Sequence, residues 1–195
     1  TIAYVRGEAV RDKTKLLKQH IWLVNSDGSQ DRQFTRGPRA DVHPRWSPDG
    51  KRLAFLSDRL EDGKLQVYSM DRDGGEAQAL TEVKGSLDTT TGRSSLLWSP
   101  DGKFLSFLMT DPETAREKKR KEDKDDAYAH EGERKYLRLW TLEVSTRKLT
   151  QVTRGPVQVW GAQWSPDGRK FAVIISDDPF EWSWYHCRLA LVPAA

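Results

Sequence analysis

The pentapeptide WSPDG occurs three times in this chain, and it limits the possible folds more than any other feature. The copies run from Trp46 to Gly50, from Trp98 to Gly102 and from Trp164 to Gly168. Serine suits the first position of a type I turn, proline presets the backbone angle of the second, and glycine takes the left-handed conformation that follows. Each copy therefore predicts a tight hairpin turn between two strands.

Strand-like runs flank every copy of the pentapeptide. A short run ends in the tryptophan, at 42–46, 94–98 and 157–164, and a second run follows the turn, at 51–57, 103–109 and 169–176. Two further runs complete each middle unit, at 65–71 with 76–81 and at 136–143 with 147–153. The chain opens with runs at 2–6, 20–25 and 31–35 that correspond to the second, third and fourth strands, and it closes with a third strand at 187–192.

Four short strands in each repeated unit are typical of the blades of a β-propeller. We expect an all-β fold, a partial propeller of about three and a half four-stranded antiparallel blades. Residues 1–195 would form one incomplete domain, with units at about 1–37, 38–84, 85–155 and 156–195. A blade cannot bury both of its faces alone, so the repeated tryptophan is expected to pack between one blade and the next. The residues assigned to this structural repeat are Trp46, Pro48, Asp49, Gly50, Trp98, Pro100, Asp101, Gly102, Trp164, Pro166, Asp167 and Gly168.

The number of blades leaves three alternatives open, because closed propellers use about four to eight blades and an open array exposes strand edges. The chain is a fragment of a larger propeller, or two copies close a ring together, or the ends are covered by something else. We favour the fragment. The open blade edges would also allow self-association.

A highly charged insertion at 111–135 interrupts the third unit, with 17 charged residues among its 25. It falls between the second and third strands of its blade, and we expect a solvated, mobile or marginally helical excursion there. The basic cluster at 118–121 is surrounded by acidic residues, and the overall net charge is only +3. A nucleic-acid partner is therefore not expected.

The sequence contains neither a membrane-spanning run nor a pair of cysteines for a disulfide. No run approaches the ~20 apolar residues that span a bilayer, so no membrane partner is expected. The only cysteine is Cys187, which excludes an internal disulfide and suits a reducing compartment such as the cytoplasm.

Catalytic and metal-binding motifs are missing from this chain. The closest approach to a G-x-S-x-G nucleophile elbow is the segment 92–96, which lacks the second glycine and leads into a strand. Asp71, Asp73 and Glu82 have three places of a calcium loop, but the required glycine at the sixth place is Glu76. We therefore assign no catalytic residue, no metal and no cofactor.

Two groups of residues remain as candidates for a substrate channel. Asp41, His43 and Arg45 alternate with apolar residues along one innermost strand, which predicts a polar face. Trp182 and Trp184 belong to an aromatic cluster in the loop before the last strand. Packing against a neighbouring blade explains the aromatic cluster better than substrate contact does.

The segment WSPDGKRLAFLSDR, followed by LQVYSMDRDGGEAQALT, resembles the N-terminal propellers of the prolyl oligopeptidase family of serine peptidases. The acylaminoacyl-peptidase branch is the nearest, because the charged insertion also looks like one found in that branch. TolB-type propellers share the WSPDG turn and the DGG turn. The resemblance covers nearly the whole chain.

The resemblance implies a partner and a function. In that family the propeller precedes an α/β-hydrolase domain with a Ser, Asp, His triad, and it covers the active site as a lid that admits short peptides. This chain would then be the lid of an enzyme acting on short or N-acylated peptides, without catalytic activity of its own. The alternatives are a TolB-like protein-binding scaffold, which would be periplasmic, and a homodimeric binding module made of two half propellers.

Overall fold

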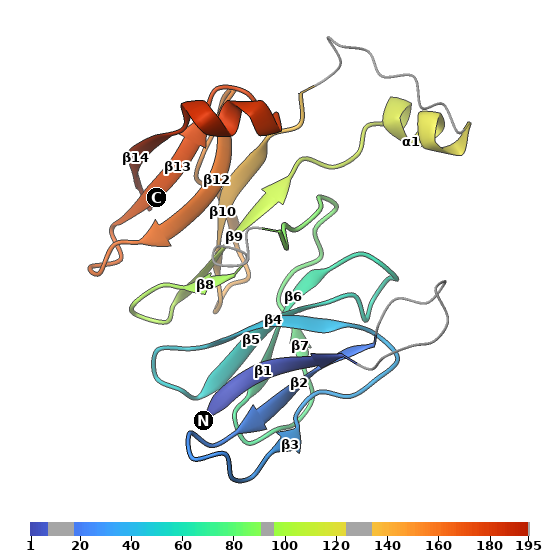
Figure 1. Cartoon of the computed structure of the whole chain (residues 1–195), viewed down its shortest axis with the longest axis vertical. Coiled ribbons are helices and arrows are strands. Elements are labelled where there is room, and N and C mark those ends of the chain that lie inside the picture. The colour runs from blue at the N-terminus through green and yellow to red at the C-terminus, as the bar shows by residue number, and fades with distance from the viewer. Residues whose placement is uncertain (8–17, 91–95, 124–133, 195) are drawn as a thin grey trace.

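The computed structural model describes residues 1–7, 18–90, 96–123 and 134–194, and they form four antiparallel sheets (Figure 1). The first sheet contains β1 (Ile2–Gly7), β2 (Gln19–Val24) and β3 (Arg32–Gln33). The second contains β4 (Asp41–Trp46), β5 (Arg52–Ser57), β6 (Gln66–Asp71) and β7 (Gln78–Ala79). The third contains β8 (Leu97–Trp98), β9 (Phe104–Thr110), β10 (Leu137–Glu143) and β11 (Leu149–Gln151), and the fourth contains β12 (Gln158–Trp164), β13 (Lys170–Ser176) and β14 (Arg188–Pro193).

The sheets follow one another along the long axis of the molecule in the order of the sequence (Figure 1). In each sheet, strands that are consecutive in the sequence pair as antiparallel neighbours. The described strands number three, four, four and three, because the first sheet lacks an innermost strand and the last lacks an outermost one. The prediction of an all-β partial propeller is confirmed.

Three hydrophobic clusters fill the spaces between neighbouring sheets. One face of β5 contributes Leu53 and Phe55 to the cluster against the first sheet, and the other face contributes Ala54 and Leu56 to the cluster against the third. A third cluster around Phe171 joins the last two sheets. A strand buried on both faces reads as a nearly continuous apolar run, and this explains the sequence RLAFLS.

Each WSPDG segment forms the same hydrogen-bonded turn. In the second copy, the Ser99 hydroxyl donates to Oδ1 of Asp101 at 2.6 Å and accepts from the backbone N–H of Phe104 at 2.9 Å. The other two copies repeat these bonds with Ser47 and Ser165. Glycine closes each turn with φ of 68°, 70° and 70°, a conformation that other residues adopt only with strain.

The three repeated tryptophans lie where each sheet meets the preceding one. Trp46 packs with the cluster between the first two sheets, Trp98 with the next cluster and Trp164 with the last. Trp98 also donates from Nε1 to the carbonyl oxygen of Arg45 at 2.9 Å, so it links the third sheet to the second.

A second repeated contact lies at the outer edge of the first three sheets. The Thr35, Thr81 and Thr153 hydroxyls accept hydrogen bonds of 2.9, 2.9 and 3.0 Å from backbone N–H groups of the neighbouring third strand. All three threonines are buried. Each therefore fixes the end of a short outer strand that has few ladder hydrogen bonds of its own.

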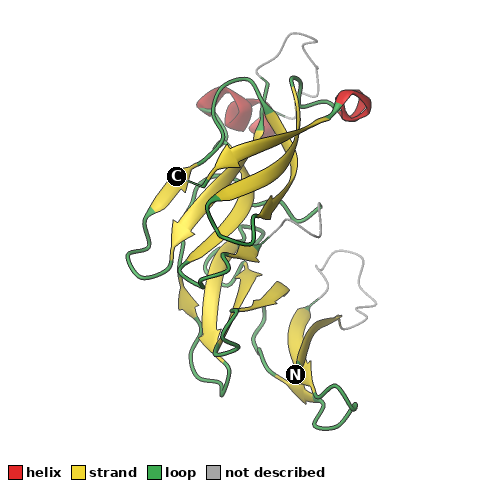
Figure 2. Cartoon of the chain, turned by 90° about the vertical axis from the view of Figure 1, so that its left-hand side faces the viewer, coloured by secondary structure: helices red, strands yellow, loops and turns green. Residues whose placement is uncertain are grey.

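The charged insertion contains α1 (Ala115–Glu122), in agreement with the expectation of a marginally helical excursion. Thr114 and Glu117 form a capping box: the Glu117 carboxylate accepts from the backbone N–H of Thr114 at 2.7 Å, and the Glu117 N–H donates to the Thr114 hydroxyl at 3.3 Å. The segment expected to be a loop before the last strand instead includes a 3-10 helix, η1 (Glu181–His186). The helical segments stand out from the strands in Figure 2.

Some expectations fall outside the described residues. They include most of the rejected elbow candidate at 92–96, the first part of the expected strand at 94–98, His130 and residues 124–133 of the insertion. Among the described helices, none is both long and apolar enough to cross a membrane.

The last sheet presents one apolar face that no described residue covers. Ile174 and Leu189 are cross-strand partners in this sheet, as Leu56 and Val67 are in the second sheet. Ile174 and Leu56 each follow the glycine of their turn by six residues, so the two pairs hold equivalent positions. Leu56 and Val67 are fully buried, but Leu189 is 73% exposed. In the inner sheets the same positions form a blade interface.

Candidate substrate-facing site

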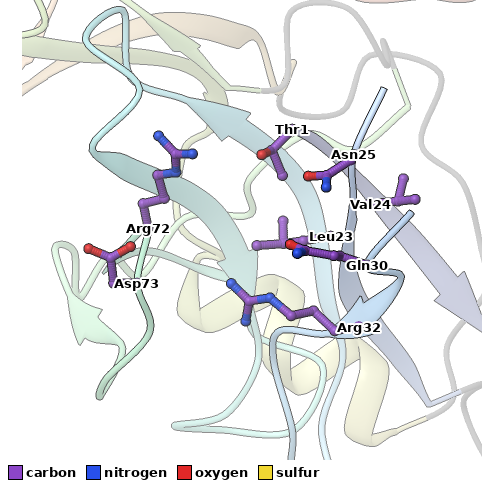
Figure 3. A pocket seen from close by; sticks show the side chains of 8 residues that line it. All are labelled: Thr1, Leu23, Val24, Asn25, Gln30, Arg32, Arg72 and Asp73. Carbon is purple, nitrogen blue, oxygen red and sulfur yellow. The ribbon is translucent and has the colours of Figure 1, made fainter. Parts of the chain in front are cut away.

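Two of the hollows in the molecule repeat each other. One has a volume of about 150 Å³ and lies between the first two sheets, beside Asn25, Arg32 and Arg72 (Figure 3). The other, of about 300 Å³, lies between the second and third sheets and is lined by the corresponding residues of the next pair of blades. A hollow that recurs at successive interfaces follows from the stacking of similar sheets. We therefore do not assign a binding function to either one.

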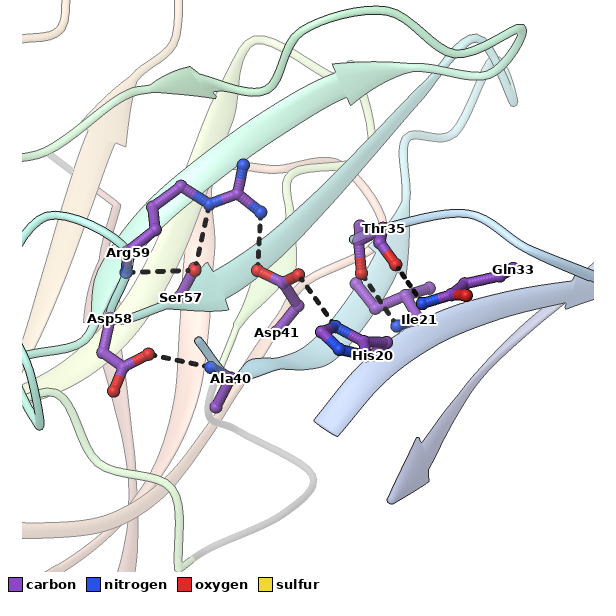
Figure 4. A network of polar contacts seen from close by, with 9 residues as sticks. All are labelled: His20, Ile21, Gln33, Thr35, Ala40, Asp41, Ser57, Asp58 and Arg59. Atoms are coloured by element: carbon purple, nitrogen blue, oxygen red, sulfur yellow. Dashed lines mark hydrogen bonds and ion pairs between the residues drawn. The ribbon is translucent and has the colours of Figure 1, made fainter. Parts of the chain in front are cut away.

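Asp41 lies at the start of β4 within a buried polar network (Figure 4). Its Oδ1 contacts Nη2 of Arg59 at 2.6 Å, and its Oδ2 lies 3.7 Å from Nδ1 of His20 in the preceding sheet. Arg59 also donates from Nε to the Ser57 hydroxyl at 3.1 Å. Asp41 is only 1% exposed, so its carboxylate links two blades and offers no surface to a substrate.

A second carboxylate holds the loop beside this network. Asp58 accepts hydrogen bonds from the backbone N–H groups of Ala40 at 2.9 Å and Gly63 at 3.1 Å. The loop after β5 is therefore tied to the strand entry at β4 through two adjacent side chains. The sequence analysis missed Arg59 and Asp58, although the SDR sequence directly after a buried strand is a usable signal for such a network.

His43 and Arg45 lie apart from Asp41 because β4 has a bulge between Val42 and Arg45. The expected regular alternation of Asp41, His43 and Arg45 on one polar face is therefore wrong. The extra residue turns the chain so that His43 adopts φ of 53°, an uncommon conformation for a residue with a side chain. Asp41 enters the network between the sheets, and the other two residues line an open hollow.

This hollow has a volume of about 410 Å³ and is lined by residues of β1, the first residue of β2, and β4. Its lining residues are Ala3, Tyr4, Val5, Gln19, Val42, His43, Pro44 and Arg45. Burial lowers the pKa of the His43 imidazole, the positive charge of Arg45 lowers it further, and Asp88 opposes the shift. His43 therefore offers a neutral ring at pH 7, able to accept or donate a hydrogen bond.

The aromatic candidates lie on η1, at the other end of the described chain. Trp182 is 58% exposed, and its ring stacks with that of Phe180 at 6.2 Å between centroids. The Trp184 ring meets the Trp160 ring edge-on at 5.5 Å, and Trp160 donates from Nε1 to the Ser176 hydroxyl at 2.8 Å. One side of Trp184 therefore packs against the innermost strand of its own sheet, while the other remains open.

The long connections of the fold share one end of the sheets. In an antiparallel sheet that runs up and down, the connection between the second and third strands lies opposite the first turn. Three segments are such connections: the loop at 58–65 that contains Arg59, the charged insertion, and the segment with η1. We call this the loop end, and we call the opposite end, with its WSPDG turns, the turn end. Asp41 lies at the loop end.

Histidines show no nucleophile pairing in the described part of the chain. His20, His43 and His186 make no hydrogen bond there to a serine hydroxyl or to the Cys187 thiol. Burial raises the pKa of that thiol, which favours its neutral form. Nor does any group of three His, Cys, Asp or Glu side chains in the described ranges have the arrangement of a metal site.

Comparison with known proteins places these features in a family. The model of a family described as the TolB beta propeller domain, PD40, matches residues 10–130. The uncharacterized peptidase YuxL of Bacillus subtilis is 29% identical over 86% of this chain, and the match covers 26% of that protein. The chain therefore spans about a quarter of the length of this relative.

Solved structures give the same fold. A putative TolB from Agrobacterium tumefaciens aligns with 92% of this chain and 52% of its own, with a TM-score of 0.58 and 23% identity. The acylaminoacyl peptidase of Pyrococcus horikoshii aligns with 89% of this chain and 26% of its own, with a TM-score of 0.59 and 18% identity. At these identities the structures support the propeller fold alone.

Proposed function

The chain belongs to the TolB β-propeller family, and from this premise we propose that it is the substrate-gating portion of a longer, acylaminoacyl-peptidase-like serine peptidase. The observation that carries the proposal is the similarity to a peptidase along 86% of the chain, together with a share of only 26% of that relative's length. The remaining length of such a protein would hold the α/β-hydrolase domain with its catalytic triad. This chain would select short or N-acylated peptides and leave their cleavage to that domain.

The loop end is the side that we assign to substrate. Its connections differ from blade to blade, whereas the turn end repeats the same pentapeptide, and variable loops on a rigid scaffold are where binding residues usually lie. Trp182 and Trp184 present exposed aromatic surface there. His43 would add a polar group along the innermost strand of the second blade, while Arg45 lies nearer the turn end, directly before Trp46.

Activity measurements on the purified chain test the first part of this proposal. We expect no hydrolysis of acetyl-alanine or other short peptide substrates, because the described histidines have no nucleophile partner. Turnover that survives repurification and is abolished by a serine-directed inhibitor would overturn the non-catalytic role.

Kinetics of the parent peptidase test the gating role. We expect Trp184→Ala to raise KM for short peptides about threefold or more while kcat is unchanged, because the indole would contact substrate equally in the ground and transition states. Lys103→Ala, at an exposed position of the turn end, is the matched control and should change neither parameter. Equal kinetics of both variants with peptides of every length would contradict the gating role.

A protein-binding scaffold of the TolB type is the second candidate. The observation in its favour is that the matching family model is built on TolB. The sequence of the parent protein after Ala195 separates the two candidates. A nucleophile elbow followed by acid and histidine residues supports the peptidase, and a stop after two or three more blades supports the scaffold.

A further inference from the structure

Trp160 is the residue that the innermost strand of the last sheet leaves out of its ladder. The register of β12 against β13 shifts between Val159 and Gly161, so Trp160 has no cross-strand partner. Such a bulge re-aims a side chain, and bulges are common beside functional sites. The innermost strands of a propeller surround its central channel. Trp160 therefore stands on the edge of its sheet that borders the channel.

A pair of buried serines fixes η1, the red helix in Figure 1, to the last sheet. The hydroxyl oxygens of Ser176 and Ser183 lie 3.0 Å apart, and both residues are buried. Ser183 donates to the carbonyl oxygen of Asp178 at 2.6 Å. Trp160 donates from Nε1 to the Ser176 hydroxyl at 2.8 Å. The two hydroxyls therefore hold both Trp160 and the helix that carries Trp184.

Trp160 and Trp184 form an aromatic corner. Their rings meet at 83° with the centroids 5.5 Å apart, so one indole presents its face where the other presents its edge. Trp184 is 49% exposed, and solvent therefore reaches the corner. The face of an aromatic ring attracts cations, and tryptophan does so more strongly than tyrosine or phenylalanine.

An exposed carboxylate lies on the same side of η1 as Trp184. A 3-10 helix has three residues per turn, so Glu181, in the first turn, stands one turn before Trp184. Glu181 is exposed and makes no ion pair within the described ranges, whereas the nearby Asp177 carboxylate pairs with Arg188. The aromatic corner therefore has an uncompensated negative charge beside it.

The same segment already holds one guanidinium with a ring and a carboxylate. Arg134 lies over the Phe180 ring, 6.0 Å from its centroid, and pairs with the Asp178 carboxylate. The aromatic corner and Glu181 offer a second place of this kind. Among the described lysines and arginines, none lies over either ring of the corner. A positively charged side chain from another molecule fits this combination of groups.

We propose that Trp160, Trp184 and Glu181 bind the positively charged side chain of an arginine or lysine residue in the peptide substrate, a role that rests on the proposed function and narrows it to basic peptides. The indole rings would attract the cation, and the carboxylate would set its position. The two serine hydroxyls would hold the corner in place before the peptide arrives, so that little order has to be gained on binding.

Kinetics of the parent peptidase measure this preference. Two N-acetylated tripeptides, which have no terminal ammonium, differ only in arginine or its neutral isostere citrulline. We expect kcat/KM to favour the arginine peptide by about fivefold or more, and Glu181→Gln to remove most of that preference. Glu82→Gln, at an exposed position after β7, is the matched control and should leave the preference unchanged. Equal kcat/KM for both peptides, or a preference that survives Glu181→Gln, would overturn the proposal and leave the peptidase function standing.

Binding to the purified chain separates this role from peptidase activity. N-acetyl-arginine amide should shift the indole N–H resonances of Trp160 and Trp184 saturably, and N-acetyl-citrulline amide should not. Glu181→Gln should weaken the binding of the arginine amide about fivefold. Indole resonances that move equally with both amides, or with neither, would overturn the proposed subsite. Selective binding of the arginine amide together with a parent protein that cleaves no peptide would overturn the proposed function alone.

Discussion

The two ends of the sheets differ in how closely the blades resemble one another. At the turn end, three pentapeptides make the same turn, with the same serine and aspartate contacts and nearly identical glycine φ angles. At the loop end, the equivalent connections are a short loop tied down by Asp58, a charged insertion with α1, and η1 with its tryptophans.

The difference shows which part of a blade must repeat. The turn sets the angle between two strands and brings the tryptophan against the neighbouring sheet, so every blade needs the same solution there. A connection at the other end has only to return the chain to the next strand, and its length and composition can vary. These variable loops are the part of the molecule to which the proposed function assigns substrate contact.

The largest effect should come from the tryptophans of the turn end. Trp98→Ala removes a large side chain from the interface of the second and third sheets, and we expect a loss of about 3 to 5 kcal/mol in the free energy of unfolding. Trp182→Ala at the loop end is the matched control, with a change within about 0.5 kcal/mol. Chemical denaturation measures both. A change below about 1 kcal/mol for Trp98→Ala would show that this tryptophan does not pack between the second and third sheets.

The next effect tests whether the loop end also carries structural groups. Asp41→Asn keeps the side-chain volume but removes the charge that Arg59 contacts, and we expect a loss of about 2 to 3 kcal/mol. The exposed Asp62→Asn in the same loop should have little effect. Urea denaturation measures the free energy of unfolding of both variants. Equal stability would mean that the Asp41 network contributes nothing to blade packing.

A smaller effect is expected within the turn itself. Ser99→Ala removes the hydroxyl that donates to Asp101 and accepts from Phe104, at a buried position, so we expect a loss of about 1 to 2 kcal/mol. Thermal unfolding followed by circular dichroism measures it. A variant as stable as the original protein would show that the proline and glycine alone define the turn.

The same turn should respond to acid. The Ser99 hydrogen bond holds the pKa of Asp101 below its ordinary value of 3.8. A carboxylate with a lowered folded pKa stabilises the fold above its unfolded pKa and loses that contribution as the pH falls through the folded pKa. The difference in stability between the original chain and Ser99→Ala should therefore narrow below about pH 4.

The smallest effect concerns α1. Lys135 and the Thr114 backbone N–H lower the pKa of Glu117 from 4.5 to about 2. This favours the capped helix above pH 4.5 and is lost as the pH falls toward 2. Glu117→Gln should reduce the amide protection of α1 at pH 7 but shift the overall Tm by less than about 1 °C. A global shift of several degrees would mean that the insertion supports the propeller.

The bounds of the strands show which parts of the fold the local sequence predicts. The runs expected at 51–57 and 169–176 appear as Arg52–Ser57 and Lys170–Ser176, because alternating or continuous apolar residues next to a proline-glycine turn leave few other solutions. The outer strands were expected to be longer than they are: 76–81 is a strand only at Gln78–Ala79. The side chain of Thr81 replaces part of that ladder.

The amino-acid sequence by itself determined the class of fold, the order of the strands and the turns between them, since these depend on residues that are neighbours along the chain. Only the tertiary structure decided the surroundings of Asp41, His43 and Trp184. Asp41 lies beside His20 of the preceding blade, and a single extra residue in β4 separates it from His43 and Arg45. Trp184 meets Trp160, which is 24 residues earlier in the chain. Contacts between distant segments depend on packing distances, and no local pattern encodes those distances.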